Sequence, residues 1–390
     1  MVDKKNAGKD SVQMDEKVSA LSTWPAMLLT IGMIAAAIYS FSPRSYDAFP
    51  ETVVKADGFL ANSVANRGSR YVAVGERGEI LYADSPEGPW TDAEVDNKRG
   101  ATLTRIRFIS DDVAIALGHN GWIIRSEDSG KTWKEVQFND DSSDPLLDFG
   151  GPYNGKLIAV GSFGQFETSQ DQGKTWQKET LAFAEQDAAD ADADTPAEVS
   201  SVNDPESDDY DPFAAFSEGG GAKSLANEHL NGIAQTQDGA LFIVGERGLL
   251  LRSTDNGETW NRLDDIYDGS FYGGVVTPDK GFLVYGMRGN AYVTQDQGQT
   301  WTQSNIPVVQ GLFEGTVTDG NIILVGASNT VLMSSDNGAN FELVSASGSS
   351  GLVSIVPLAK GEWLTAGEGG VNTLQPDKNK KSASREGDKS

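Results

Sequence analysis

Short apolar runs recur along most of the chain, and six of the seven copies continue into a Gly-x-x-Gly turn and a second apolar run. Examples are YVAVGERGEILYA, which begins at Tyr71, and LFIVGERGLLLRS, which begins at Leu241. A polar turn then leads to a third run that opens with Trp or Phe. Runs rich in Val, Ile, Leu and Tyr between Gly and Asp turns are typical of β-strands. The pattern therefore predicts short antiparallel strands.

The first glycine of this turn occurs seven times at a nearly constant interval. Successive copies are 43, 43, 84, 41, 40 and 41 residues apart. Repeats of about 40 residues with four short strands are typical of β-propeller blades. The doubled step indicates an insertion in one connection. The glycines are Gly75, Gly118, Gly161, Gly245, Gly286, Gly326 and Gly367.

The fourth strand of each blade is the apolar run before the repeat, such as LTRIRFIS from Leu103 or GLVSIVP from Gly351. The seventh repeat lacks its outer strand, whereas ETVVKA (51–56) is a spare strand before the first blade. We expect this segment to complete the last blade, because ring closure leaves only short, protected sheet edges. The fold class is therefore all-β, a seven-bladed β-propeller over residues 51–374.

The polar turns share the pattern Ser/Thr-x-Asp-x-Gly-x-Thr-Trp, with four strong copies and a looser one that ends at Phe341. An Asp in a turn accepts backbone N–H groups, and Gly supplies the positive φ. The Trp is expected to pack between neighbouring blades. Because the same chemistry recurs in each copy, we interpret these residues as structural rather than catalytic. They are Asp128, Asp171, Asp255, Asp296, Asp336, Trp133, Trp176, Trp260 and Trp301.

The insertion, about residues 183–224, contains 12 acidic residues and one lysine. This composition has too little apolar content to fold alone, so we expect a disordered acidic loop. DAADADADTPAE superficially resembles a calcium loop, but its glycine and terminal glutamate do not fall at EF-hand spacing. We expect neither a metal nor another cofactor.

An uncharged stretch precedes the propeller, and its apolar centre, residues 24–41, is long enough to span a bilayer. We interpret it as a retained transmembrane helix; a cleaved signal sequence and a buried core helix are the alternatives. Four lysines precede the helix, whereas Arg44 and Lys55 are the nearest basic residues after it, which favours a cytoplasmic amino terminus and an extracytoplasmic propeller. Residues 375–390 are expected to form a flexible tail.

Composition excludes several functions. The net charge of -26, from 57 acidic and 31 basic residues among 390, repels phosphate backbones and argues against a nucleic-acid partner. The absence of cysteine excludes disulfides, thiolate metal sites and a lipid-modified cysteine. With only two histidines, His119 and His229, zinc sites and hydrolase triads are disfavoured.

The polar turn is similar to the Asp-box, or BNR, repeat. Together with VGERG in two blades and YGMRG in a third, it makes residues 51–374 resemble the photosystem II assembly and stability factor family of seven-bladed propellers. This resemblance implies a non-enzymatic, membrane-bound protein that binds a partner through an arginine-rich patch. Non-photosynthetic members resemble accessory subunits of resistance-nodulation-division (MMPL-type) exporters. The missing lipid-anchor cysteine and the acidic insertion favour such a member, with its propeller in the periplasm beside an inner-membrane complex.

The third positions of the Gly-x-x-Gly turns are expected on one face of the ring, because they all connect the second and third strands. Three of them are arginines, and clustered arginines suit bidentate recognition of carboxylates. A surface salt bridge to Glu76 or Glu246 is the alternative role for two of them. The expected partner-binding residues are Arg77, Arg247, Arg288, Asn120 and Phe163.

Asp boxes also occur in sialidases, so a glycoside hydrolase is a further alternative. A sialidase requires three arginines, a Tyr/Glu nucleophile pair and an acidic proton donor. The chain has no Arg-Ile-Pro motif, and Tyr71, Tyr82 and Tyr153 have no obvious paired glutamate. We therefore expect no enzymatic activity, and the partner is either an exporter or, as an alternative, photosystem II itself.

Overall fold

The computed structural model describes residues 24–41, 56–183, 225–345 and 349–375. It divides the chain into two units, Met1–Thr52 and Val53–Ser390. The first contains the helix α1 (Trp24–Phe41), which is long and apolar enough to cross a membrane. Such a helix is a candidate transmembrane span or signal sequence. The expectations for residues 1–23, 42–55, 184–224 and 376–390 lie outside the described residues.

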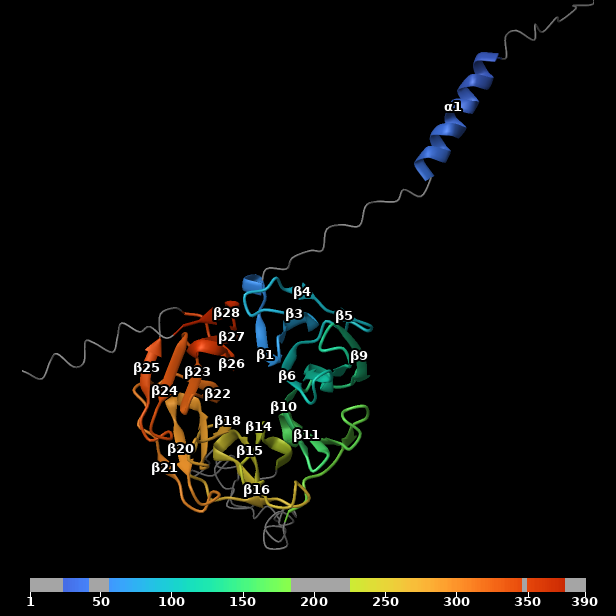
Figure 1. Ribbon diagram of the computed structural model, residues 1–390. Coiled ribbons are helices and arrows are strands. Elements are labelled where there is room, and N and C mark those ends of the chain that lie inside the picture. Colours follow the sequence, from blue (N-terminus) through green and yellow to red (C-terminus); the bar gives the residue numbers. More distant parts are fainter. Residues whose placement is uncertain (1–23, 42–55, 184–224, 346–348, 376–390) are drawn as a thin grey trace, which may run out of the picture. The chain divides into compact units, whose positions relative to one another are not determined.

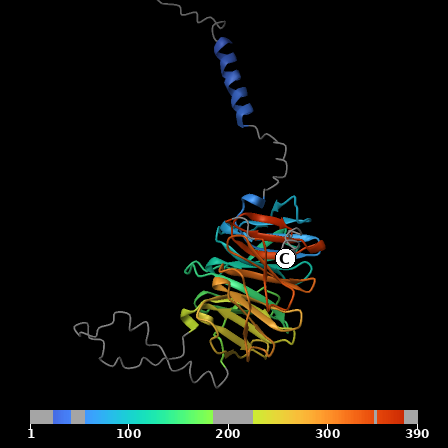
Figure 2. The same cartoon turned by 90° about the vertical axis from the view of Figure 1, so that its left-hand side faces the viewer.

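The second unit is a propeller of seven antiparallel sheets arranged around a central axis, as predicted (Figure 1). Figure 2 shows the ring from its side. Within each blade, strand A is innermost, and strands B, C and D follow outward in chain order. This meander requires only short turns between strands, which explains why each repeat closes within about 40 residues.

The strand bounds follow the repeat. The first blade consists of β1 (Ala61–Arg67), β2 (Arg70–Gly75), β3 (Ile80–Ala83) and β4 (Thr91–Asp92). The second has β6 (Leu103–Phe108), β7 (Ala114–Gly118), β8 (Ile123–Ser126) and β9 (Thr132–Gln137). The third has β10 (Leu146–Tyr153), β11 (Lys156–Gly161), β12 (Phe166–Ser169) and β13 (Gln177–Lys178). The fourth has β14 (Leu230–Gln235), β15 (Leu241–Gly245), β16 (Leu250–Ser253) and β17 (Asn261–Arg262).

The remaining blades repeat this order. The fifth contains β18 (Phe271–Val276), β19 (Phe282–Gly286), β20 (Ala291–Thr294) and β21 (Thr302–Gln303). The sixth contains β22 (Leu312–Thr318), β23 (Asn321–Gly326), β24 (Thr330–Ser334) and β25 (Glu342–Ser345). The seventh contains β26 (Leu352–Pro357), β27 (Trp363–Gly367) and β28 (Gly370–Leu374).

The seventh blade has three strands within the described residues. The segment expected to supply its fourth strand, 51–56, lies outside them except for Ala56, which begins the short helix η2 (Ala56–Gly58) beside β28. Ala56 and Phe59 are buried in one apolar cluster with Leu364 and Val371 of the seventh blade. The chain that enters the first blade therefore packs against the last one.

One strand was not predicted. β5 (Glu94–Val95), which follows the first blade's D strand, pairs in parallel with Thr132 and Trp133 and becomes a fifth strand of the second blade. Isolated parallel bridges, Phe183 with Trp260 and Asn305 with Asn340, repeat this contact further around the ring. The parallel contact connects the exit of one blade to the strand that follows the polar turn of the next.

The first glycine of each turn is required for a steric reason. A Cβ at Gly118 would lie 2.1 Å from the backbone oxygen of Thr102, at the entrance to the inner strand. The corresponding Gly75 would meet the oxygen of Leu60 at 1.9 Å. Because real side chains never approach backbone this closely, only glycine lets strand B cross the start of strand A at this point.

Candidate functional site

The turns between strands B and C carry the predicted ring of third positions. Six of these residues are not glycine, and all six have a left-handed backbone. Such a conformation is uncommon outside glycine. They are Arg77 (φ 57°), Asn120 (60°), Phe163 (53°), Arg247 (52°), Arg288 (58°) and Ser328 (56°).

The three arginines of the ring are exposed. Among the described residues, no ion pair or hydrogen bond involves the side chain of Arg77, Arg247 or Arg288. The alternative salt bridge from Arg247 to Glu246 is not formed; Glu246 instead faces His229, with 3.6 Å between Oε1 and Nδ1. These guanidinium groups therefore keep their hydrogen-bond donors available to another molecule.

The structure does not bring all five predicted residues together. Phe163, Arg247 and Arg288 lie on three consecutive blades, the third to the fifth, whereas Arg77 lies on the first blade, across the ring. Phe163 is 53% exposed, and its ring meets His229 edge-on at 4.9 Å between centroids. Asn120 is half-buried and donates to the oxygens of Asn139 and Ser142, so its amide holds a neighbouring loop.

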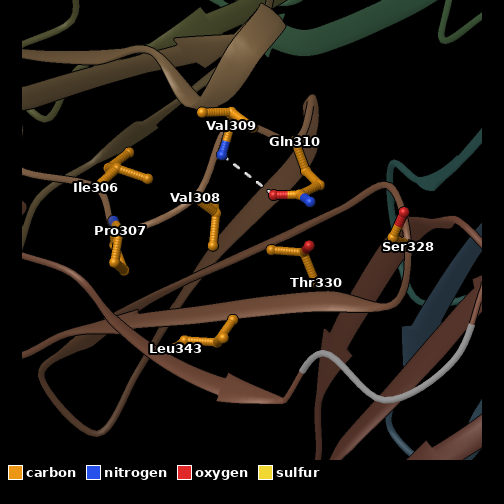
Figure 3. Close-up of a pocket in the computed structure, with 8 residues that line it drawn as sticks. All are labelled: Ile306, Pro307, Val308, Val309, Gln310, Ser328, Thr330 and Leu343. Atoms are coloured by element: carbon orange, nitrogen blue, oxygen red, sulfur yellow. Dashed lines mark hydrogen bonds between the residues drawn. The ribbon is translucent and has the colours of Figure 1, made fainter.

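An apolar groove of about 570 Å³ is lined by residues 306–310 and by residues of the sixth blade (Figure 3). The turn that carries Arg288 packs against residues 308–309. Gly289 packs so closely against the groove's loop that a Cβ there would be 2.3 Å from the oxygen of Val308. Val308 and Leu343 line the groove, and neighbouring Val309 is 79% exposed. The lining residues are Ile306, Pro307, Val308, Val309, Gln310, Ser328, Thr330 and Leu343, none of them charged.

The internal repeat explains why this groove is open. Thr330 and Leu343 occupy the repeat positions that Trp122 and Glu135 hold in the second blade. There, the Trp122 side chain is fully buried and donates from Nε1 to Glu135 at 3.1 Å, and Arg99 binds Glu135 from the incoming loop at 2.7 Å. Threonine and leucine leave that volume unfilled in the sixth blade.

The aspartates of the polar turns, termed Asp-box aspartates here for their resemblance to that repeat, lie in the C–D turns on the opposite face and bind their own turn. In the second blade, Asp128 accepts hydrogen bonds from Ser126 Oγ at 2.8 Å, Thr132 N at 2.9 Å and Thr132 Oγ1 at 2.7 Å. Asp171, Asp255 and Asp296 repeat this arrangement, and at Asp336 an asparagine amide replaces the threonine hydroxyl. The carboxylates are thus occupied by local donors.

The Asp-box tryptophans pack against the preceding blade. Trp260 of the fourth blade is fully buried and meets Phe166 of the third edge-on at 6.2 Å. Trp301 of the fifth blade likewise faces Phe242 of the fourth at 6.3 Å. Trp133 and Trp301 also donate from Nε1 to the oxygen of their own turn glycine. Each box thus connects its turn to the neighbouring sheet.

A second repeated contact lies at the central channel, where each inner strand carries a bulge. In four blades, the residue at the bulge accepts a backbone N–H from the next blade. Ser63 accepts from Ile106 at 3.3 Å, Asp148 from Ile233 at 3.1 Å, Glu314 from Ile355 at 3.1 Å and Ser354 from Val64 at 3.1 Å. The last of these bonds closes the ring between the seventh and first blades.

The second blade carries Arg105 at its bulge, and the channel contains a charged cluster there. Arg105 Nη1 donates to Glu314 at 2.8 Å, and its Nε lies 3.1 Å from Asp148. Arg107 Nη2 also donates to Asp148, at 2.9 Å. Burial opposes ionisation of Asp148, but attraction to Arg107 and Arg105 outweighs it and lowers its pKa. Burial raises the pKa of the nearby Tyr153 and Tyr285 phenols, which stay protonated.

Sequence reasoning missed this cluster, although the repeat contained its signal. Arg105, Asp148 and Glu314 each stand two residues after the buried leucine that opens an inner strand, where the first and seventh blades have serine. Charged residues at one repeat position inside predicted strands indicate side chains that face one another. Within the described residues, no group of three or more His, Asp or Glu side chains is arranged to hold a metal ion.

No protein-family model and no curated protein matches this chain. Solved structures do share its fold. YCF48 bound to D1 peptide superposes with a TM-score of 0.57 and 12% identity over 82% of this chain and 94% of that one. YCF48 from Cyanidioschyzon merolae superposes with a TM-score of 0.58 and 14% identity, over 83% of this chain and 98% of that one. The GH74 xyloglucanase from Xanthomonas campestris superposes with a TM-score of 0.59 and 14% identity, over 83% of this chain and 53% of that one.

These likenesses support the propeller family at the level of the fold. They include protein-binding propellers and an enzyme alike, because one propeller scaffold hosts many activities. The fold by itself therefore does not define the function of this chain.

Proposed function

We propose that this chain is a non-catalytic, membrane-anchored propeller that binds a protein partner through the face carrying Arg77, Arg247 and Arg288. The observation that carries the proposal is that these arginines are exposed without an ion pair among the described residues. In a chain of net charge -26, such groups form a local positive surface suited to a partner's carboxylates.

The fourth and fifth blades are the centre of the proposed interface. Arg247 and Arg288 occupy adjacent turns, and exposed apolar groups flank them, Phe163 on the third blade and Val309 beside the groove. Charged residues next to apolar anchors are typical of protein-binding hot spots. An acidic segment with apolar side chains would match this surface.

The partner's class follows from the anchor. If α1 spans the inner membrane with the propeller in the periplasm, the partner is a membrane complex. We favour an accessory role beside a resistance-nodulation-division (MMPL-type) exporter; assembly of photosystem II is the alternative. The fold shared with YCF48, whose solved structure contains a D1 peptide, supports recognition of a polypeptide.

The test is purification of the full chain from its native membrane in mild detergent, followed by identification of copurifying proteins. Wild type is compared with the triple variant Arg77→Ala/Arg247→Ala/Arg288→Ala and with Arg247→Ala/Arg288→Ala. Lys131→Ala/Lys174→Ala, which removes two exposed charges from the Asp-box face, is the matched control.

We expect one membrane complex to copurify with wild type and the lysine control, and to be lost from both arginine variants. The identity of that complex separates an exporter from a photosystem. Retention of the partner in the triple variant would place the interface elsewhere. Absence of a partner from wild type would contradict the proposal and favour a small ligand or an enzyme.

A further inference from the structure

The inner strands enclose a cavity of about 520 Å³ in the central channel. Its lining extends from the charged cluster around Arg105 to Arg67, Gln235 and Pro357, where inner strands reach their A–B turns. Antiparallel alternation places A–B turns on the same face as the Asp boxes. The cavity therefore lies toward the face opposite the exposed arginine turns.

The charged cluster exceeds what the ring requires for stability. At the bulge positions, Ser63 and Ser354 accept the next blade's N–H with a neutral hydroxyl. Asp148 and Glu314 perform the same task with charged groups and so require counter-ions beside them in the channel. Buried ion pairs are rarely more stabilising than neutral packing. The blade contacts by themselves thus do not account for two arginines here.

The unused hydrogen-bonding capacity of the cluster consists of donors. Both oxygens of Asp148 and both oxygens of Glu314 already accept a hydrogen bond. Arg107, in contrast, makes one hydrogen bond within the described part of the chain, where its buried Nε has no acceptor, and its side chain is 42% exposed. The buried Nε of Arg105 has an ion-pair contact with Asp148 but no hydrogen bond.

We propose that this channel cavity binds a carboxylate group, which accepts hydrogen bonds from the free side of the Arg107 guanidinium. A planar guanidinium matches a carboxylate with two parallel donors. A cavity of this volume accommodates a small organic acid or an acidic side chain of an inserted peptide. The site is separate from the proposed partner face, so either proposal can fail alone.

The experiment is isothermal titration of the full chain in mild detergent with two probes: succinate, and the capped tripeptide acetyl-Gly-Glu-Gly-amide. At least one probe is expected to bind with a stoichiometry of one. Arg107→Gln is expected to weaken that binding at least tenfold. Arg77→Ala/Arg247→Ala/Arg288→Ala and Arg67→Gln, at the cavity's far end, are expected to leave it within twofold.

Succinate binding alone would assign a free organic acid, and tripeptide binding alone would assign an acidic segment. Failure of both probes to bind wild type would overturn the proposal, with water satisfying Arg107 instead. Binding that survives Arg107→Gln, or that disappears in the triple variant, would also overturn it. Thermal melting verifies the fold; if Arg107→Gln does not fold, Arg107→Lys keeps the charge and is expected to lower affinity severalfold through loss of the planar fork.

Discussion

Arg105 and Glu314 join two blades that are not neighbours. Nη1 of Arg105, on the second blade, donates to Oε1 of Glu314, on the sixth, across 209 residues of sequence. The same guanidinium contacts Asp148 of the third blade. Because the two carboxylates also accept N–H groups from the fourth and seventh blades, this cluster connects five of the seven blades at the channel.

Replacement of Arg105 by alanine should lower the free energy of unfolding by about 3–5 kcal/mol, because it leaves the buried Asp148 and the largely buried Glu314 without their shared counter-ion. Urea unfolding followed by circular dichroism measures the change. Arg67→Ala is the control, since Arg67 and its partner Asp111 are 54% and 84% exposed. That exposed pair should contribute about 0–1 kcal/mol. Equal losses in the two variants would argue against a structural role for the cluster.

The Asp-box turns should make stability depend on acid pH. Hydrogen bonds from Thr300 lower the pKa of Asp296 to about 2. At Asp255, burial opposes this effect, but bonds from Thr259 outweigh it and the pKa is again about 2. A carboxylate whose folded pKa is depressed stabilises the protein fully above its unfolded pKa, roughly 3.9. Stability should therefore fall from about pH 4 toward pH 2.

Denaturant unfolding at several pH values between 2 and 6 tests this expectation. Asp255→Asn/Asp296→Asn should be less stable than wild type at pH 6, and its loss between pH 4 and 2 should be smaller. If the free energy of unfolding falls as steeply between pH 4 and 2 in the double variant as in wild type, other carboxylates cause the acid sensitivity.

Glu167 should have the opposite effect on the pH dependence of stability: its contribution should be lost as pH rises. Its side chain is fully buried on β12, where Gln137 Nε2 donates to it at 2.8 Å, and burial raises its pKa. The folded state then binds a proton more tightly than the unfolded chain, so stability is lost as pH rises through the raised pKa. Glu167→Gln should melt at a higher temperature than wild type at pH 7 and at a similar one at pH 4.

Glu135→Gln is the matched control for that experiment. Bonds from Arg99 lower the pKa of Glu135, so removal of its charge should lower the melting temperature at pH 7. If the melting temperature at pH 7 changes in the same direction in both variants, the charge state of Glu167 does not limit stability.

The Asp-box tryptophans should differ in energetic weight. Trp260→Ala should cost about 3–5 kcal/mol, because the side chain is fully buried between the third and fourth blades. Trp176→Ala should cost less, since Trp176 is only partly buried. Urea unfolding of both variants measures the difference, and equal costs would contradict the packing argument.

The repeat determined the fold because each blade is built from local contacts. Strands A to D are consecutive in the chain, and their turns require Gly and Asp at fixed offsets, so a 40-residue pattern specified strands, turns and blade number. Even the left-handed backbone of Arg77 and Arg288 follows from a turn that the sequence displays.

Apart from the packing of the polar-turn tryptophans, tertiary structure alone decided which contacts form between blades. Glu94 and Val95 form a parallel strand because the neighbouring blade offers an open edge there. The pairing of Arg105 with Glu314 depends on ring closure, which brings inner strands face to face at a register that no local pattern encodes. Arg247 likewise has no ion pair with Glu246, because Glu246 faces His229 instead. That contact is set by packing between the turn and the start of the inner strand. Local periodicity thus specified each blade, whereas the charged cluster of the channel depended on distances across the closed ring.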